Sequence, residues 1–179
     1  MCIGDRSWGV DARIFDPEGG EVPRGTLGEI VARSPGVTAG YLNDPEQTAR
    51  ALAGGWLHTG DLGYMDRDGY IFIGDRAKDM IVTGGENVFS AEVETAIASC
   101  PGVAQVAVIA IPNDQWGEAV HAVVVPVAGA VLTGEQIIAH CRARIAGFKC
   151  PKSVDVRAEP LPLSGVNKVQ KNVLREPYW

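Results

Sequence analysis

The stretch from Arg76 to Asn87 constrains the fold most, because the sequence differs in character on its two sides. Short strand-like runs and turns precede it, whereas a helical pattern and a second set of strands follow it. Charges of both signs lie at a turn here, and Gly84 and Gly85 would let other backbone or a ligand approach closely. We therefore expect a hinge that also forms a binding surface. A hairpin turn followed by an ordinary loop is the alternative.

The part before this stretch has the pattern of a small, mostly β unit. Asp44 followed by Pro45 is typical of a helix N-cap and first helical position, and Gly54 and Gly55 are expected to end this short helix. Gly69 is expected to adopt a positive φ in a hairpin turn. The expected strands include residues 10–15, 29–33, 64–65 and 70–73.

The part after it has the pattern of a compact α+β unit, with two main helices on a small sheet. Ser90 is expected to cap the first helix, and Thr133 with Gln136 forms a capping box for the second, which Gly147 would end. The apolar residues that share one face of the first helix are Val93, Ala96, Ile97 and Cys100. The expected strands are 103–111, 119–127 and 154–156, and a short helix is expected at 169–175. The predicted fold class is α+β, with domains at residues 1–75 and 76–179.

Composition and charge argue against several classes of protein. The net charge is −6 and the basic residues are scattered, which argues against nucleic acid as the main partner. Charged residues interrupt the apolar region 103–132 too often for a membrane span. The four cysteines have no zinc-site or disulfide spacing, so we expect no metal and a cytoplasmic location. The first residues do not resemble a signal peptide, and the chain reads as though it starts inside a longer protein.

A few residues outside the expected cores have side chains suited to a nucleotide or an anion. Asp61 could accept hydrogen bonds from both hydroxyls of a ribose, although such an aspartate more often only shapes a turn. Arg76 could pair with a phosphate or ribose, and Lys78 lies where a rotation would occur. Lys168 follows a turn that looks mobile, so its ammonium could reach a phosphate or carboxylate. Lys152, Lys171 and Arg175 near it have the pattern of a solvated basic cluster.

No catalytic triad is indicated, because His58, His121 and His140 lack suitably spaced partners, and we expect all three to be structural. Gly84 and Gly85 before a helix could form an anion-binding nest. Their spacing is neither that of a P-loop nor that of a dinucleotide fingerprint.

Several motifs taken together closely resemble the adenylate-forming enzymes, a family that includes acyl-CoA synthetases, peptide-synthetase adenylation domains and beetle luciferases. The match runs from about Gly4 to the end, and its motifs keep the family's order and spacing. The closing residues, 174–179, look most like those of a fatty-acyl or aryl CoA ligase. The motifs are Gly28-Glu29-Ile30, Gly40-Tyr41, residues 55–63, residues 75–81, residues 84–88 and the turn at Lys168.

This resemblance implies a reaction in two steps, separated by a large rotation of the C-terminal domain. A carboxylic acid first reacts with ATP to give an acyl adenylate, and coenzyme A then displaces AMP. Asp61 matches the ribose-binding aspartate, Arg76 the arginine at ribose or phosphate, Lys78 the hinge, and Lys168 the lysine that bridges carboxylate and α-phosphate. The residues that match the coenzyme A side are Gly84, Gly85, Glu86, Trp116, Phe148 and Lys152. Mg²⁺ is implied together with ATP, but its ligands are not expected in this chain.

Two departures from the family pattern matter. Cys150 occupies a place where some relatives have an arginine near the coenzyme A nucleotide. In addition, the family's phosphate loop, adenine motif and acyl pocket belong to a large N-terminal domain, of which residues 1–75 match only the last β-rich part. We therefore expect this chain to be an inactive C-terminal fragment of an acyl-CoA ligase. The alternatives are a freestanding module that acts in trans with a separate N-terminal chain, and an adenylation domain of a peptide synthetase.

Overall fold

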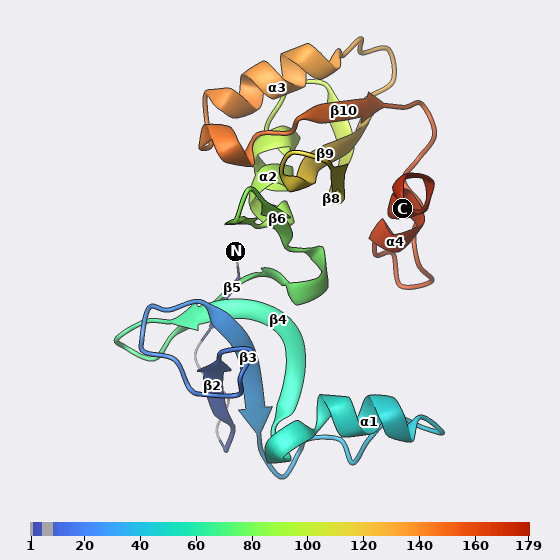
Figure 1. The fold of residues 1–179 in the computed structure, drawn as a ribbon. Coiled ribbons are helices and arrows are strands. Elements are labelled where there is room, and N and C mark those ends of the chain that lie inside the picture. Colours follow the sequence, from blue (N-terminus) through green and yellow to red (C-terminus); the bar gives the residue numbers. More distant parts are fainter. Residues whose placement is uncertain (1, 5–8) are drawn as a thin grey trace. The chain divides into compact units, whose positions relative to one another are not determined.

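The computed structural model describes residues 2–4 and 9–179 and has the expected α+β fold. It divides into two compact units, Met1–Lys78 and Asp79–Trp179, which are described separately (Figure 1). The division falls after Lys78, within the stretch that separates the two sequence patterns.

The first unit is built on a five-stranded antiparallel sheet with the strand order β1-β5-β4-β3-β2. Its helix α1 (Pro45–Ala51) begins as predicted, because the Asp44 side chain accepts a hydrogen bond from the backbone nitrogen of Gln47 at 2.9 Å. Gly69 adopts a φ of 90° in the β4–β5 hairpin turn, also as predicted. The strands are β1 (Cys2–Gly4), β2 (Asp11–Phe15), β3 (Gly28–Arg33), β4 (Leu57–Met65) and β5 (Ile71–Arg76), and two 3-10 turns lie at Ala53–Gly55 and Ala77–Asp79.

Alternating side chains of these strands form the core of the first unit. Ile14, Ile30 and Met65 are buried together, with Val22 and Ile71 packed against them. A pair of facing glycines lets the sheet close tightly. A Cβ on Gly63 would lie 2.4 Å from the carbonyl oxygen of Phe72, and one on Gly28 would lie 2.4 Å from that of Phe15. The sheet beside Asp61 therefore depends on both glycines.

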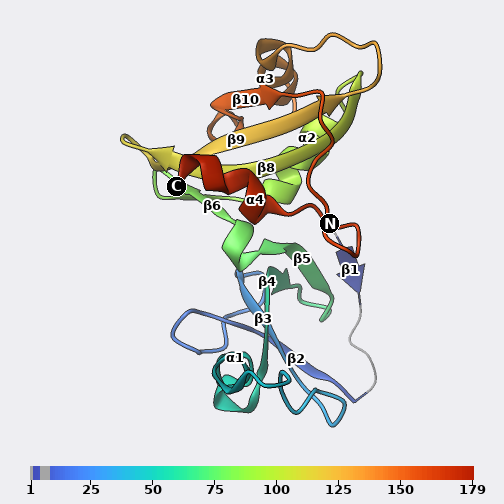
Figure 2. The same cartoon turned by 90° about the vertical axis from the view of Figure 1, so that its right-hand side faces the viewer.

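The second unit has a five-stranded sheet in the order β10-β9-β6-β7, with β8 also paired to β9 (Figure 2). The pairs are antiparallel except for β9 with β10, which is parallel. Strands β8 and β9 read as continuous apolar runs because the sheet is covered on both faces. The strands are β6 (Ile81–Thr83), β7 (Glu86–Val88), β8 (Val103–Asn113), β9 (Gly117–Pro126) and β10 (Ser153–Val156). The helices are α2 (Ser90–Ala98), α3 (Gly134–Arg142) and α4 (Lys171–Arg175), with 3-10 turns at Gly147–Lys149 and Glu176–Tyr178.

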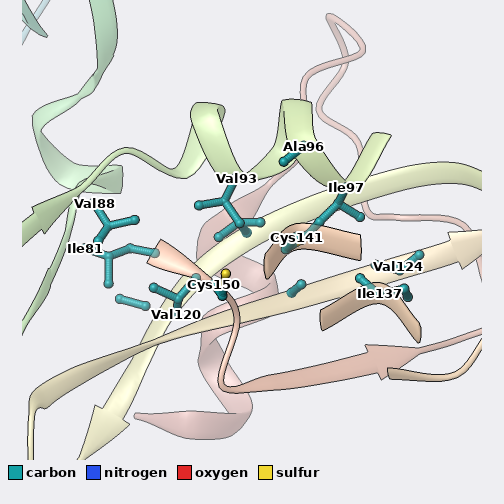
Figure 3. Close-up of a cluster of buried hydrophobic side chains, with 13 residues drawn as sticks. Ile81, Val88, Val93, Ala96, Ile97, Val120, Val124, Ile137, Cys141 and Cys150 are labelled. Atoms are coloured by element: carbon teal, nitrogen blue, oxygen red, sulfur yellow. The ribbon is translucent and has the colours of Figure 1, made fainter. Parts of the chain in front are cut away.

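Two apolar clusters hold this unit together, one on each face of the sheet. The larger cluster packs α2 and α3 against one face and includes Ile97, Val120, Val124, Ile137 and Cys141 (Figure 3). The smaller one packs Leu161 and Leu174 against Ala107, Ile109, Val123 and Val125 on the other face. Because Val123 and Val125 alternate with Val124 along β9, α4 is fixed on the side of the sheet opposite to α2 and α3.

Two details of the helix ends differ from the predictions. Ser90 is not the cap of α2: Phe89 holds that position, and the buried Ser90 hydroxyl accepts a hydrogen bond from Lys171 Nζ at 2.6 Å. The capping box of Thr133 and Gln136 is present at the start of α3, as predicted. Gly147 does not end α3, because the helix stops at Arg142 and Gly147 begins a 3-10 turn. Ile145, which packs on the core, lies in the connection between them.

Two further observations concern only the part of the chain that the structure describes. No helix there is long and apolar enough to cross a membrane. Among residues 9–179, no three side chains of His, Cys, Asp or Glu come together in a way that could hold a metal ion.

Candidate functional site

The candidate nucleotide residues Asp61 and Arg76 lie opposite each other on neighbouring strands of the first unit. They are paired in the β4–β5 register, and Arg76 Nε lies 3.4 Å from Asp61 Oδ1. The Asp61 side chain is 33% exposed and that of Arg76 is 52% exposed, so solvent and a ligand can reach both groups. A carboxylate held in this way keeps lone pairs for hydroxyl donors, and the guanidinium beside it suits an anion.

Lys78 lies in the 3-10 turn after β5 and is exposed. It is the last residue of the first unit. The position agrees with a connection between two compact parts, while its use as a hinge remains a prediction.

Gly84 and Gly85 form the two-residue turn of the β6–β7 hairpin, with φ angles of 60° and 83°. Positive φ at both central positions is what a tight hairpin turn of this length requires, and glycine adopts it without strain. The Gly84 backbone nitrogen donates to the Trp116 carbonyl oxygen at 2.9 Å. A Cβ on Gly84 would lie 2.8 Å from Trp116 Cε3, so the indole lies directly over the turn. Glu86 follows the turn and is exposed.

Trp116 lies in the turn between β8 and β9 and is 44% exposed. Its backbone nitrogen donates to Asn113 Oδ1 at 3.0 Å, which fixes the turn that carries it. Phe148 is 42% exposed in the 3-10 turn at Gly147–Lys149, and Lys152 is exposed just before β10. The second unit thus places two aromatic rings and an ammonium at its surface.

Lys168 lies in an exposed turn whose backbone is fixed by two hydrogen bonds to Ser164. The Ser164 nitrogen donates to the Lys168 carbonyl oxygen at 2.8 Å, and the Lys168 nitrogen donates to Ser164 Oγ at 3.2 Å. Asn167 has a φ of 58°, which asparagine tolerates better than most residues. The backbone is therefore held while the long lysine side chain stays in solvent.

The basic cluster near Lys168 is not simply solvated, contrary to the prediction. Lys171 Nζ lies 2.7 Å from Glu94 Oε1, with side chains 15% and 25% exposed. Arg175 pairs with Asp79 at 3.0 Å. These residues anchor α4 to the rest of the second unit, and only Lys152 and Lys168 are exposed as expected.

Each of the three histidines has a structural partner in the fold. His58 Nδ1 lies 2.7 Å from Glu29 Oε2, and His140 Nε2 lies 2.9 Å from Ser99 Oγ. His121 contacts Ser153 Oγ at 2.7 Å and the Tyr178 hydroxyl at 3.1 Å. Burial lowers the pKa of His121, an effect that the nearby Asp155 partly opposes.

Known proteins are similar to this chain in sequence and in fold. Residues 92–168 match the family of the AMP-binding enzyme C-terminal domain. A feruloyl-CoA synthase from an Amycolatopsis species is 45% identical over 98% of this chain and 35% of its own length. The long-chain-fatty-acid–CoA ligase FadD13 of Mycobacterium tuberculosis is 46% identical over 84% of this chain and 30% of its own. The crystal structure of ATP-bound MatB from Rhodopseudomonas palustris has a TM-score of 0.88 and 44% identity, over 98% of this chain and 35% of that one.

Residues 92–168 therefore match the AMP-binding enzyme C-terminal domain family, and the chain is similar to adenylate-forming enzymes over most of its length. It spans about a third of the length of these relatives.

Of the two departures from the family pattern, Cys150 is the one that the structure explains most directly. Its side chain is 3% exposed, and its thiol donates to the Ala146 carbonyl oxygen at 3.6 Å. Burial raises the pKa of this thiol. Cys150 is therefore part of the core and offers no cationic group at the surface.

Sequence reasoning did not find the structural role of two carboxylates, those of Glu29 and Glu94, near the candidate site residues. Glu29 holds the strand segment next to Asp61, and Glu94 holds Lys171 on α4. Glu29 lies in the Gly28-Glu29-Ile30 motif, but that motif does not indicate what the Glu29 carboxylate contacts. Its partners lie 29 and 31 residues away along the chain, so no local pattern reveals them.

Proposed function

We propose that this chain is the C-terminal part of an acyl-CoA ligase, which activates a fatty or aryl carboxylic acid with ATP and transfers the acyl group to coenzyme A. The observation that carries the proposal is the Asp61–Arg76 pair. A half-exposed carboxylate and a guanidinium lie side by side, in a chain whose second unit has the AMP-binding C-terminal fold. The names of the feruloyl-CoA and long-chain fatty acid relatives support this substrate class.

In the first step, the substrate carboxylate attacks the α-phosphorus of ATP, and pyrophosphate leaves as the acyl adenylate forms. Asp61 would accept hydrogen bonds from the ribose hydroxyls, and Arg76 would contact ribose or phosphate. Lys168 would bring its ammonium between the carboxylate and the α-phosphate, where it offsets the negative charge of both. The exposed side chain and fixed backbone of Lys168 suit such a reach.

In the second step, the sulfur of coenzyme A attacks the acyl carbon and AMP leaves. The bare backbone of Gly84 and Gly85 would let the pantetheine arm pass closely, next to Glu86. Trp116, Phe148 and Lys152 would contact coenzyme A, since aromatic faces and an ammonium suit adenine and phosphate groups. The buried Cys150 is not part of this contact.

The two steps use residues of both units. We propose that a rotation at Lys78 changes which residues of the second unit reach the reacting groups in each step. Residues 1–75 would be the last β-rich part of the AMP-binding domain, and residues 76–179 the mobile C-terminal domain. The phosphate loop, the acyl pocket and the ligands of the Mg²⁺ that accompanies ATP would lie in an N-terminal partner domain. A cytoplasmic location stays a prediction from the sequence.

A chimera tests this proposal. The N-terminal part of Rhodopseudomonas palustris MatB would be joined to this chain in place of its own matching C-terminal part. We expect the chimera to catalyse ATP–pyrophosphate exchange and thioester formation with the acid that intact MatB uses. This chain alone, and the MatB part alone, should do neither. A folded chimera without either activity would contradict the proposal.

A further inference from the structure

Strand β4 departs from regular pairing with β3 where it carries Asp61. Glu29 pairs with Leu62 and Val31 pairs with His58, so the single residue Ile30 faces the three residues 59–61. A bulge of this kind takes backbone groups out of the regular ladder, and they need other partners. The groups that hydrogen-bond to the backbone of this bulge determine where the Asp61 carboxylate points.

The side chain of Glu29 supplies two of these contacts. Its Oε1 accepts a hydrogen bond from the Gly60 nitrogen at 2.9 Å, and its Oε2 lies 2.7 Å from His58 Nδ1. The Glu29 and His58 side chains are only 27% and 26% exposed. One carboxylate thus holds both the start of the bulge and its central glycine, which has a φ of 72°.

Thr59 extends this support to Asp61 itself. Its hydroxyl donates to the Ile30 carbonyl oxygen at 2.7 Å and accepts from the Asp61 nitrogen at 3.1 Å. The backbone nitrogens of Gly60 and Asp61 are therefore both tied to β3, the first by Glu29 and the second through the Thr59 hydroxyl. The Asp61 carboxylate projects from this fixed segment toward Arg76.

We propose that Glu29 is a positioning residue for the ribose site: its carboxylate sets the bulge that presents Asp61 to the two ribose hydroxyls. Glu29 does not touch the nucleotide. The inference rests on the proposed function, because it takes Asp61 as the ribose-binding group. It adds that ribose recognition depends on a second carboxylate, one strand away.

The first test uses the full chain alone. In Glu29→Ala, the Gly60 amide loses its acceptor, so its NMR signal should shift and its hydrogen exchange should accelerate by about tenfold or more. Glu29→Gln keeps an acceptor oxygen at the same reach and should retain much of the protection. Glu29→Asp is one methylene shorter, keeps the charge, and should fail to hold both partners. An unchanged Gly60 amide in Glu29→Asp and Glu29→Ala would overturn the proposal, whatever the chimera does.

The second test asks whether the bulge serves the ribose. The MatB chimera would be titrated with AMP and with 2′,3′-dideoxy-AMP. The dissociation constant for 2′,3′-dideoxy-AMP divided by that for AMP measures recognition of the two ribose hydroxyls. We expect the ratio to fall by about tenfold in Asp61→Ala and by a similar factor in Glu29→Ala. Glu29→Gln should keep most of it, and Glu29→Asp replaces Glu29→Ala if that variant does not fold.

The outcomes separate the two proposals. A chimera that does not distinguish the two nucleotides overturns the ribose role of Asp61 and the role of Glu29 with it. If Asp61→Ala loses the distinction while Glu29→Ala and Glu29→Asp keep it, only the positioning role is overturned and the proposed function stands. A merely structural role of Glu29 would lower stability without changing this ratio.

Discussion

Arg175 of helix α4 donates a hydrogen bond to Asp79 at 3.0 Å, with side chains that are 20% and 14% exposed. Asp79 follows the proposed hinge residue, and Arg175 is the last residue of α4, the helix that follows the Lys168 turn. The helix is anchored a second time by Lys171, which contacts Ser90 and Glu94 of α2. Glu94 Oε1 also accepts from the Val108 nitrogen at 2.8 Å. The Lys168 turn is therefore mounted on a helix that half-buried ion pairs hold in place.

We expect Lys171→Met to lower the free energy of unfolding by about 1–3 kcal/mol, because it leaves the half-buried Glu94 carboxylate without its cation. Urea unfolding followed by far-UV circular dichroism measures this. Glu159→Gln is a matched control, since its ion pair with Arg157 is long at 3.9 Å and Glu159 is 74% exposed. Equal effects of the two substitutions would show that the ion pair of Lys171 does not stabilise α4.

Stability should fall at mildly acidic pH because of His121. Burial lowers the pKa of His121 below its ordinary 6.5, so the unfolded chain binds the proton more readily than the folded one. The stability that neutral His121 contributes is complete above pH 6.5. It is lost as the pH falls toward the pKa that His121 has in the folded protein, which is lower than 6.5. Urea midpoints measured across this range should fall with pH. The fall should be smaller in His121→Gln than in the control His140→Gln, and equal slopes in both would contradict this account.

The three buried cysteines should resist alkylation in the folded protein. Cys141 is fully buried, and burial raises its pKa to about 11, while Cys100 and Cys150 are 8% and 3% exposed. The nucleophile in alkylation is the thiolate, which is scarce at Cys141 and Cys150, and burial shields all three sulfurs from the reagent. In a Cys2→Ser variant, mass spectrometry should show no labelling under native conditions and three labels in urea. Labelling of any of them at the unfolded rate would contradict the prediction.

The features that sequence predicted correctly are those set by neighbouring residues. The Asp44 and Thr133 caps act on residues three positions away, and the buried face of α2 follows from helical spacing. Ser90 was misread because its hydroxyl is used by Lys171, 81 residues further along the chain. Local patterns cannot report such a contact.

Contacts between residues far apart in the chain also determine the candidate site, and local sequence patterns do not reveal them. Asp61 and Arg76 were found by motif, but their pairing depends on the register of β4 with β5. The bulge beside Asp61 arises from contacts between β3 and β4, so Glu29 and Thr59 gained a role only when the two strands were placed together. The half-buried state of Lys171 and Arg175 likewise depends on how α4 packs.

The central claim is that Lys168 serves adenylation and the Gly84–Gly85 turn serves thioester formation. Single-turnover rates of the two half-reactions in the MatB chimera, one started with acid and ATP and one with acyl adenylate and coenzyme A, test it most directly. Lys168→Ala should slow adenylation by about two orders of magnitude and change thioester formation little. Gly85→Trp should do the reverse. Gly85→Ala is its control, because it has the same backbone strain at a φ of 83° without the bulk. If Lys168→Ala and Gly85→Trp slow both half-reactions equally, the assignment of the two steps to these residues is wrong.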